Sequence, residues 1–107
     1  MRWSVETHAA VDAEIAALPV GLRARLIRLL EMVETMGLDQ LHAPHARHID
    51  GKLWELRAKA DEGIARGLYV ALAGRRVVVL HVFVKKTQKT PRAAIDVALA
   101  RMKEVER

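Results

Sequence analysis

The stretch VVVLHVFV, residues 77–84, decides the fold of this chain of 107 residues. It is rich in β-branched side chains and apolar on both faces, which is typical of a strand covered on both sides of a sheet. Turn residues at 73–75, Gly74 among them, precede it. His81 is the one polar side chain inside it. We therefore expect a central strand over residues 77–84, with the rest of the domain arranged around it.

Two further strands are predicted before the central one. Residues 52–59 alternate in polarity, and residues 64–72 place apolar side chains on one face. Residues 61–63, Asp-Glu-Gly, are typical of a turn between them. Because these connections are short, we expect antiparallel pairing. The first of these strands then carries Trp54, Leu56 and Ala58 on one face and Glu55, Arg57 and Lys59 on the other.

Helical periodicity dominates the first third of the chain. Val11, Ile15 and Leu18 predict a helix that ends before Pro19. A second helix is expected to begin at Pro19 and to stop at Gly37. Its apolar stripe consists of Leu22, Leu26, Leu29, Val33 and Met36, while Arg23, Arg25 and Arg28 are expected on its solvated face or, alternatively, on a partner surface.

The remaining segments complete an α+β domain. A short strand is expected over residues 2–5 and a loop over residues 37–51, which have no period and contain Pro44 and Gly51. Thr90 and Pro91 predict the start of a last helix, with the Thr90 hydroxyl as its N-cap. The predicted order is β-α-α-β-β-β-α, with the helical hairpin and the last helix packed on a small, mainly antiparallel sheet. Length and the lack of repeats predict one domain over residues 1–107.

Composition narrows the classes of function. The chain has no cysteine, which removes disulfides, thiolate zinc sites and cysteine nucleophiles together. Its first residues lack the apolar core of a signal peptide, and no apolar run approaches the roughly 20 residues of a membrane helix. We therefore expect a cytoplasmic protein without a membrane partner.

Positive charge is concentrated behind the central strand. The net charge is +5, and residues 85–107 hold seven Lys/Arg against three Asp/Glu. Residues 85–92 read KKTQKTPR and form a compact cationic turn. Such a turn fits a phosphate backbone or an acidic partner, and a solvated basic tail would have the same composition.

Three motifs in chain order carry a resemblance to a known family. They are DGKLWELR at residues 50–57, GIARGLY at residues 63–69 and LHVFVKKTQKTP at residues 80–91. This series resembles the phage-derived, HigB-like branch of the RelE/ParE toxin superfamily. The resemblance covers residues 48–105 well and the helical hairpin loosely, and it implies a RelE-like fold.

The resemblance further implies the toxin of a type II toxin–antitoxin pair. RelE-like members cleave messenger RNA in the ribosomal A site without a metal ion, by attack of the 2′-hydroxyl on the adjacent phosphate, and no cofactor is implied. The expected partners are the ribosome, messenger RNA and a cognate antitoxin of helix-turn-helix type, through which alone the pair would contact operator DNA. Two alternatives stay open: a ParE-like inhibitor of DNA gyrase, and a non-catalytic module that only binds its antitoxin.

The predicted site residues follow from the needs of that reaction. RNA cleavage by its own hydroxyl requires a base, an acid and positive charge at the non-bridging oxygens. Arginine suits the last role because its fork offers two parallel donors, and histidine titrates near neutral pH. The predicted catalytic residues are Arg57, Arg66, His81 and Lys89, and phosphate binding is assigned to Lys52, Lys59, Lys85 and Lys86.

Each of the central candidates has a structural alternative. Arg57 would form a surface ladder with Glu55 and Lys59. Arg66, in phase with apolar neighbours, would pair with Glu55 or Asp61. His81 would be a hydrogen-bonded core histidine.

Tyr69 and three histidines near residue 45 are further candidates for contact with a ligand. The family's arginine strand usually carries several aromatic residues around the arginine, whereas here Tyr69 alone remains, and core packing is favoured for it over base stacking. His42, His45 and His48 recur at every third position, but Pro44 argues against one helix that would present all three to zinc. They are expected to be solvated loop side chains, and no metal site is predicted.

Overall fold

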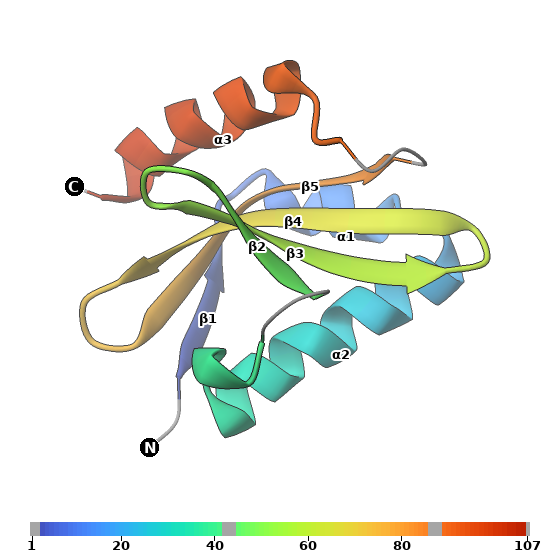
Figure 1. Cartoon of the computed structure of the whole chain (residues 1–107), viewed down its shortest axis with the longest axis horizontal. Coiled ribbons are helices and arrows are strands. Elements are labelled where there is room, and N and C mark those ends of the chain that lie inside the picture. The colour runs from blue at the N-terminus through green and yellow to red at the C-terminus, as the bar shows by residue number, and fades with distance from the viewer. Residues whose placement is uncertain (1–2, 42–44, 86–88, 107) are drawn as a thin grey trace.

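The computed structural model describes residues 3–41, 45–85 and 89–106 and shows one sheet with helices on both faces (Figure 1). The predicted α+β class is confirmed, as is the packing of a helical hairpin and a last helix on a small sheet. In chain order the elements are β1 (Ser4–Thr7), α1 (Val11–Ala16), α2 (Val20–Met36), the short 3-10 helix η1 (Leu38–Gln40), β2 (Ala46–Asp50), β3 (Leu53–Ala60), β4 (Gly63–Leu72), β5 (Arg76–Lys85) and α3 (Arg92–Val105).

The sheet has five strands in the order β1-β5-β4-β3-β2. Strands β3, β4 and β5 pair antiparallel with their neighbours in the chain, as their short connections predicted, and β2 pairs antiparallel with β3. β1 runs parallel to β5, with Ser4 opposite Arg76 and Thr7 opposite Val79. The stretch from which a central strand was predicted forms most of β5, and its residues 77–80 are buried between β1 and β4.

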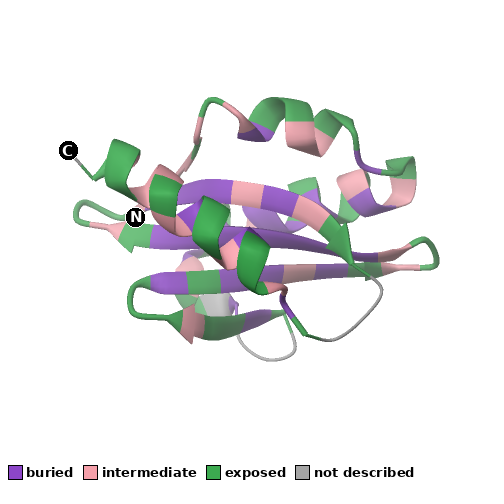
Figure 2. Ribbon diagram, turned by 90° about the horizontal axis from the view of Figure 1, so that it is seen from above, coloured by how far each residue is buried: buried purple, intermediate pink, exposed green. Residues whose placement is uncertain are grey.

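Each face of the sheet has an apolar core of its own. Figure 2 shows how buried and exposed residues are distributed along the strands and helices. On one face, Leu22, Leu26 and Val33 of α2 are fully buried against strand residues such as Leu56. On the other face, α3 buries only the small side chains Ala94 and Ala98, with larger neighbours partly exposed. Because α3 buries so little apolar surface, its polar contacts with the sheet matter more for its position.

Both ends of α2 are fixed by contacts with distant segments. At its C-terminus Gly37 has φ 91°, and a Cβ there would lie 3.0 Å from Nε1 of Trp3, so glycine suits this stop. At its N-terminus the Gly21 N–H donates to Oε2 of Glu62 at 3.2 Å, so that the carboxylate satisfies one of the orphan donors of the first turn. Glu62 thereby ties the β3–β4 turn to the start of α2. Pro19 sits at the N-cap of α2, one residue before the helix.

The predicted loop over residues 37–51 is wrong in part, because it contains strand β2. Ala46 lies opposite Leu56, and His48 lies opposite Trp54. Only Ala46 is buried in β2, whereas Arg47, His48 and Asp50 are exposed. An edge strand with so little burial shows no alternation of polarity in its sequence. It is recognised only by its pairing with β3.

The predicted N-cap at Thr90 is also wrong. Pro91 occupies the N-cap position of α3, and no side chain caps this helix. The Thr90 hydroxyl is buried and instead donates to Glu55 of β3 while it accepts from Arg66 of β4. Thr90 therefore connects the start of α3 to the sheet.

A candidate anion-binding site on the sheet

A buried carboxylate lies at the centre of the candidate site. Glu55 is completely buried on the α3 side of β3. Its Oε1 accepts from Nε of Arg57 at 2.7 Å, and its Oε2 accepts from the Thr90 hydroxyl. Oε2 also lies 3.6 Å from Nη1 of Arg66. A buried carboxylate is stable only when paired and hydrogen-bonded, and these contacts satisfy both conditions.

Arg66 is the largest fully buried side chain. Its Nη1 donates to Oγ1 of Thr90 at 3.0 Å, and the predicted alternative of a pair with Glu55 is confirmed. Burial lowers the pKa of the Arg66 guanidinium, Glu55 opposes that shift and Arg57 adds to it, yet an arginine remains protonated in a protein. Because none of its surface reaches solvent, Arg66 acts in this arrangement by holding Glu55 and Thr90.

Cations surround this buried group, and all of them are exposed except Arg57, whose side chain is 16% exposed. The strand register places Arg57 opposite Arg66, and Lys59 and Lys85 both opposite Ile64. Directly paired residues share one face of a sheet, so the three cations lie on the α3 side. Arg47 lies opposite Glu55 on the same side, and exposed Lys89 directly precedes Thr90. We call the group Arg47, Arg57, Lys59, Lys85 and Lys89 the basic end of the sheet.

One of the predicted phosphate-binding lysines, Lys52, lies away from this group. Lys52 lies at the other end of β3, where its Nζ contacts Oε2 of Glu106 at 3.1 Å. Lys59 is seven positions further along the chain, which corresponds to roughly 23 Å of extended strand. Lys86 lies outside the described residues.

His81 belongs to a separate cluster at the open edge of β5. β1 ends at Thr7, opposite Val79, so the second half of β5 has no strand of the described residues beside it on that edge. Glu14 of α1 takes the place of a strand: its Oε1 accepts from the Val82 N–H at 2.9 Å, and its Oε2 accepts from Nδ1 of His81 at 3.0 Å.

Arg101 of α3 completes that cluster. Its Nη1 donates to Oε2 of Glu14 at 2.8 Å and to the carbonyl oxygen of Leu80 at 3.0 Å. A register shift between Leu68 and Tyr69 accompanies it, which places Leu80 and His81 together on the α3 side. We call Glu14, His81 and Arg101 the edge clasp, because it joins α1, β5 and α3.

The edge clasp lowers the pKa of its carboxylate. Burial alone would raise the pKa of Glu14, but the Val82 N–H, Arg101 and His81 together hold it below its ordinary value of 4.5. The structural alternative for His81 was a hydrogen-bonded core histidine, and the structure shows the hydrogen bond, although the side chain is 17% exposed at the edge of the sheet. His81 and Glu55 lie in one cross-strand row with Leu68 between them, about 10 Å apart.

Tyr69 and the histidines between residues 42 and 48 were the remaining candidates from the sequence. Tyr69 is buried, as favoured from the sequence, and burial raises its pKa to about 12. His48 contacts Trp54 edge-on and the carbonyl oxygen of Gly51 at 2.7 Å, while His42 and Pro44 lie outside the described residues. Within residues 3–41, 45–85 and 89–106 no group of three His, Asp or Glu side chains could hold a metal ion.

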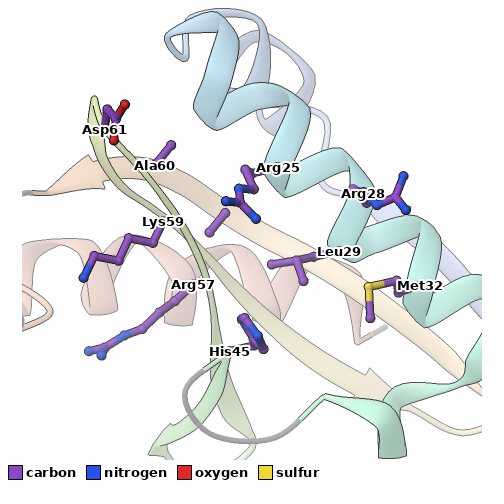
Figure 3. A pocket seen from close by; sticks show the side chains of 10 residues that line it. Arg25, Arg28, Leu29, Met32, His45, Arg57, Lys59, Ala60 and Asp61 are labelled. Atoms are coloured by element: carbon purple, nitrogen blue, oxygen red, sulfur yellow. The ribbon is translucent and has the colours of Figure 1, made fainter.

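A crevice of about 540 Å³ lies beside the basic end, between α2 and the outer edge of β3 (Figure 3). Arg25, Leu29 and Met32 line it from α2, and the last residues of β3 line it from the sheet. Figure 3 shows Arg57 and Lys59 on the side of β3 that faces away from α2. Helical spacing predicted that Arg25 lies on the solvated face of its helix. It could not predict that the edge of a strand lies across from that face.

Comparison with known proteins now bears on this arrangement. A family model described as phage derived protein Gp49-like matches residues 13–103. The chain belongs to the Gp49-like family. This family is associated with RelE-like toxins, so the predicted phage-derived toxin family is confirmed at that level. The match includes the basic end and all three residues of the edge clasp.

Two negative findings complete the comparison. No curated protein matches this Gp49-like chain. Among the helices in the described ranges, none has the length and the apolar character to cross a membrane.

Proposed function

We propose that this Gp49-like protein is the HigB-like toxin of a type II toxin–antitoxin pair, and that it cleaves messenger RNA on the ribosome with the basic end of its sheet. The observation that carries the proposal is the buried Glu55, which fixes Arg57 from below while exposed cations surround it. A carboxylate that is already satisfied by Arg66 and Thr90 does not neutralise the lysines at the surface. Net positive charge is therefore left for phosphates.

The chemistry of this site would be electrostatic. In RNA cleavage the 2′-oxygen loses its proton and bonds to the adjacent phosphorus, and the bond to the 5′-oxygen breaks as that oxygen gains a proton. Charge accumulates on the non-bridging oxygens, where a preorganised arginine stabilises it. Arg57 has the required order because Glu55 holds its Nε, and Lys59, Lys85 and Lys89 would bind the flanking phosphates.

His81 lies away from the basic end and is bonded to Glu14. Proton transfer by His81 would require it to leave Glu14, its partner at 3.0 Å, or to act from about 10 Å away in the row of Glu55. This observation favours a second candidate, a non-catalytic module that binds its partner with the same surface. For the endoribonuclease, the ribosome itself would supply the groups that transfer protons.

The test is induced expression with transcript ends mapped on ribosomes. Wild-type protein should arrest growth and produce new transcript ends, Arg57→Ala should produce neither, and Arg76→Ala should behave as wild type. Arg76 is the matched control because it lies at the opposite end of β5, in an exposed pair with Glu6. Co-expression of an antitoxin from the neighbouring reading frame should restore growth.

Other outcomes identify the rival functions. Growth arrest with intact transcripts and inhibited supercoiling would identify a ParE-like gyrase inhibitor. Normal growth at high protein level, with binding to the neighbouring gene product, would identify the non-catalytic module.

A further inference from the structure

The outer edge of β3 has one half that is paired and one half that is open. β2 pairs with β3 as far as Leu56, opposite Ala46, and the Arg57 N–H donates to the carbonyl oxygen of His45 at 2.8 Å. Beyond that point, among the described residues, β3 pairs with β4 alone. Backbone groups alternate in direction along a strand, so the N–H and C=O of Lys59 point to the same outer side as the Arg57 N–H.

The crevice lies directly against this open half. Its lining contains every residue from Arg57 to Asp61 together with Arg25, Leu29 and Met32 of α2. A volume of about 540 Å³ falls within the range of about 300–1,000 Å³ typical of ligand-binding pockets. Because α2 forms the opposite wall, only an extended chain can reach the backbone of β3 over several residues.

The two sides of β3 differ sharply in chemistry along this edge. Ala58 and Ala60 face the α2 side and pack with the core there. Leu29 and Met32 extend that apolar surface, and Arg25 and Arg28 of α2 also line the crevice. Arg57 and Lys59 face the other side, in the basic end (Figure 3). A strand added to this edge places alternate side chains on these two sides. Its residues beside Ala58 and Ala60 would be apolar, and those beside Arg57 and Lys59 would be acidic.

We propose that the crevice between α2 and β3 binds an extended segment of a partner protein in which acidic and apolar residues alternate, added to the sheet as a strand beside β3. Backbone bonds to Lys59 supply affinity, and the alternation supplies specificity. This binding goes beyond the proposed function and does not depend on RNA cleavage. One consequence does rest on that function: carboxylates beside Arg57 and Lys59 compete with phosphate for the same cations.

The experiment uses the whole chain and a synthetic hexapeptide of alternating glutamate and valine with blocked ends, labelled with a fluorophore. There are two control peptides. The lysine peptide has lysine in place of each glutamate, and the block peptide has three glutamates followed by three valines. Fluorescence anisotropy should show binding of the alternating acidic peptide and about tenfold weaker binding of both controls. Equal binding of the block peptide would overturn the strand geometry, and equal binding of the lysine peptide would overturn the charge assignment.

A pair of charge reversals locates the site. Lys59→Glu and Lys103→Glu change the net charge equally at exposed positions, one beside the crevice and one on α3. Lys59→Glu should weaken binding of the acidic peptide by about three- to tenfold, which is the range expected when an exposed ion pair is replaced by two like charges. It should also improve binding of the lysine peptide, whereas Lys103→Glu should leave both affinities unchanged. Equal effects of the two reversals would mean that only net charge matters, which contradicts the proposal.

Amide exchange tests the backbone contact directly. In 15N-labelled wild-type protein, the acidic peptide should slow exchange of the Lys59 amide, while the Arg57 amide, already bonded to His45, should change less. Binding without slower exchange at Lys59 would overturn strand addition. If a short oligoadenylate slows that amide and the peptide does not, the crevice takes single-stranded RNA and the proposal is wrong.

Discussion

Two clusters join α3 to the sheet, and both contain a glutamate bonded to an arginine. At the start of α3, Glu55 holds Arg57, Arg66 and Thr90, with both Glu55 and Arg66 fully buried. Toward the other end of α3, the edge clasp joins Glu14 to His81 and Arg101, with side chains about a fifth exposed. The first cluster lies under a surface rich in cations. The second completes the open edge of a strand.

The difference lies in what each carboxylate leaves for other partners. Glu14 is engaged by a backbone N–H, an arginine and a histidine, and Arg101 also donates to the carbonyl oxygen of Leu80. These contacts satisfy the edge of β5 and remove it as a template for further pairing. Glu55 is likewise satisfied, but Lys59, Lys85 and Lys89 stand around it exposed. An ion cluster supports binding when cations remain in excess at the surface, and it supports structure when charges and backbone groups are matched.

The largest expected effect is on stability, at Glu55. Glu55→Gln leaves the buried Arg66 guanidinium without its counter-charge, and breaking a buried pair in this way costs about 3–5 kcal/mol. Urea unfolding followed by circular dichroism measures the loss. The matched control is Glu6→Gln, which removes a carboxylate bonded to Arg76 at 2.7 Å on the exposed surface and should change stability little. Similar losses in both variants would mean that burial of Glu55 does not set the strength of its cluster.

Much of the fold was predictable, because hydrophobic periodicity encodes it locally. The strands β3, β4 and β5 and the helices α2 and α3 were all expected within a few residues of their observed positions. β2 was not, because burial of Ala46 alone leaves no pattern. The parallel pairing of β1 with β5 joins segments about 70 residues apart. The other pairings were predicted from short connections, and no short connection joins these two strands.

The candidate site was predictable in its charges and less so in its contacts. Alternation placed Glu55, Arg57 and Lys59 on one face, and the phase of Arg66 left a pair with Glu55 or Asp61 open beside a role in phosphate binding. Thr90 was assigned to a helix cap, because the pattern of hydroxyl before proline is local and the buried carboxylate that accepts its hydrogen bond is 35 residues away. The partners of His81 were missed for the same reason, since Glu14 and Arg101 lie 67 and 20 residues from it.

The next effect concerns the edge clasp and its dependence on pH. Glu14→Gln removes a charge-assisted set of bonds, each type worth about 1.5–3 kcal/mol, so stability at pH 7 should fall by about 2 kcal/mol. The pKa of Glu14 lies below 4.5 in the folded protein, so its stabilisation is present above about pH 4.5 and is lost as pH falls through the folded pKa. Wild-type stability should therefore fall more steeply than that of Glu14→Gln on acidification. Parallel pH curves would show that the clasp does not stabilise the fold.

A smaller effect separates the two arginines by function. Arg57→Lys keeps the charge but loses the fork that can hold Glu55 and a phosphate together, and affinity for a short RNA should fall about tenfold. Arg101→Lys should leave RNA affinity unchanged and reduce stability instead. For each variant, fluorescence anisotropy with labelled RNA measures affinity and urea unfolding measures stability. Loss of RNA affinity in Arg101→Lys at unchanged stability would assign RNA binding to the edge clasp as well.

The smallest expected effect distinguishes two lysines of one strand. Lys59 is exposed in the basic end, whereas Lys52 contacts Glu106 at 3.1 Å at the other end of β3. Each alanine variant removes one positive charge, so a nonspecific field would weaken RNA binding equally in both. If Lys59 contacts a phosphate, its loss releases one counterion fewer, and the slope of log affinity against log salt should decrease by about 0.7 for single-stranded RNA. Affinities measured from 50 to 200 mM salt should show that change in Lys59→Ala and no change in Lys52→Ala. The same slope in both variants would place the phosphates away from this end of β3.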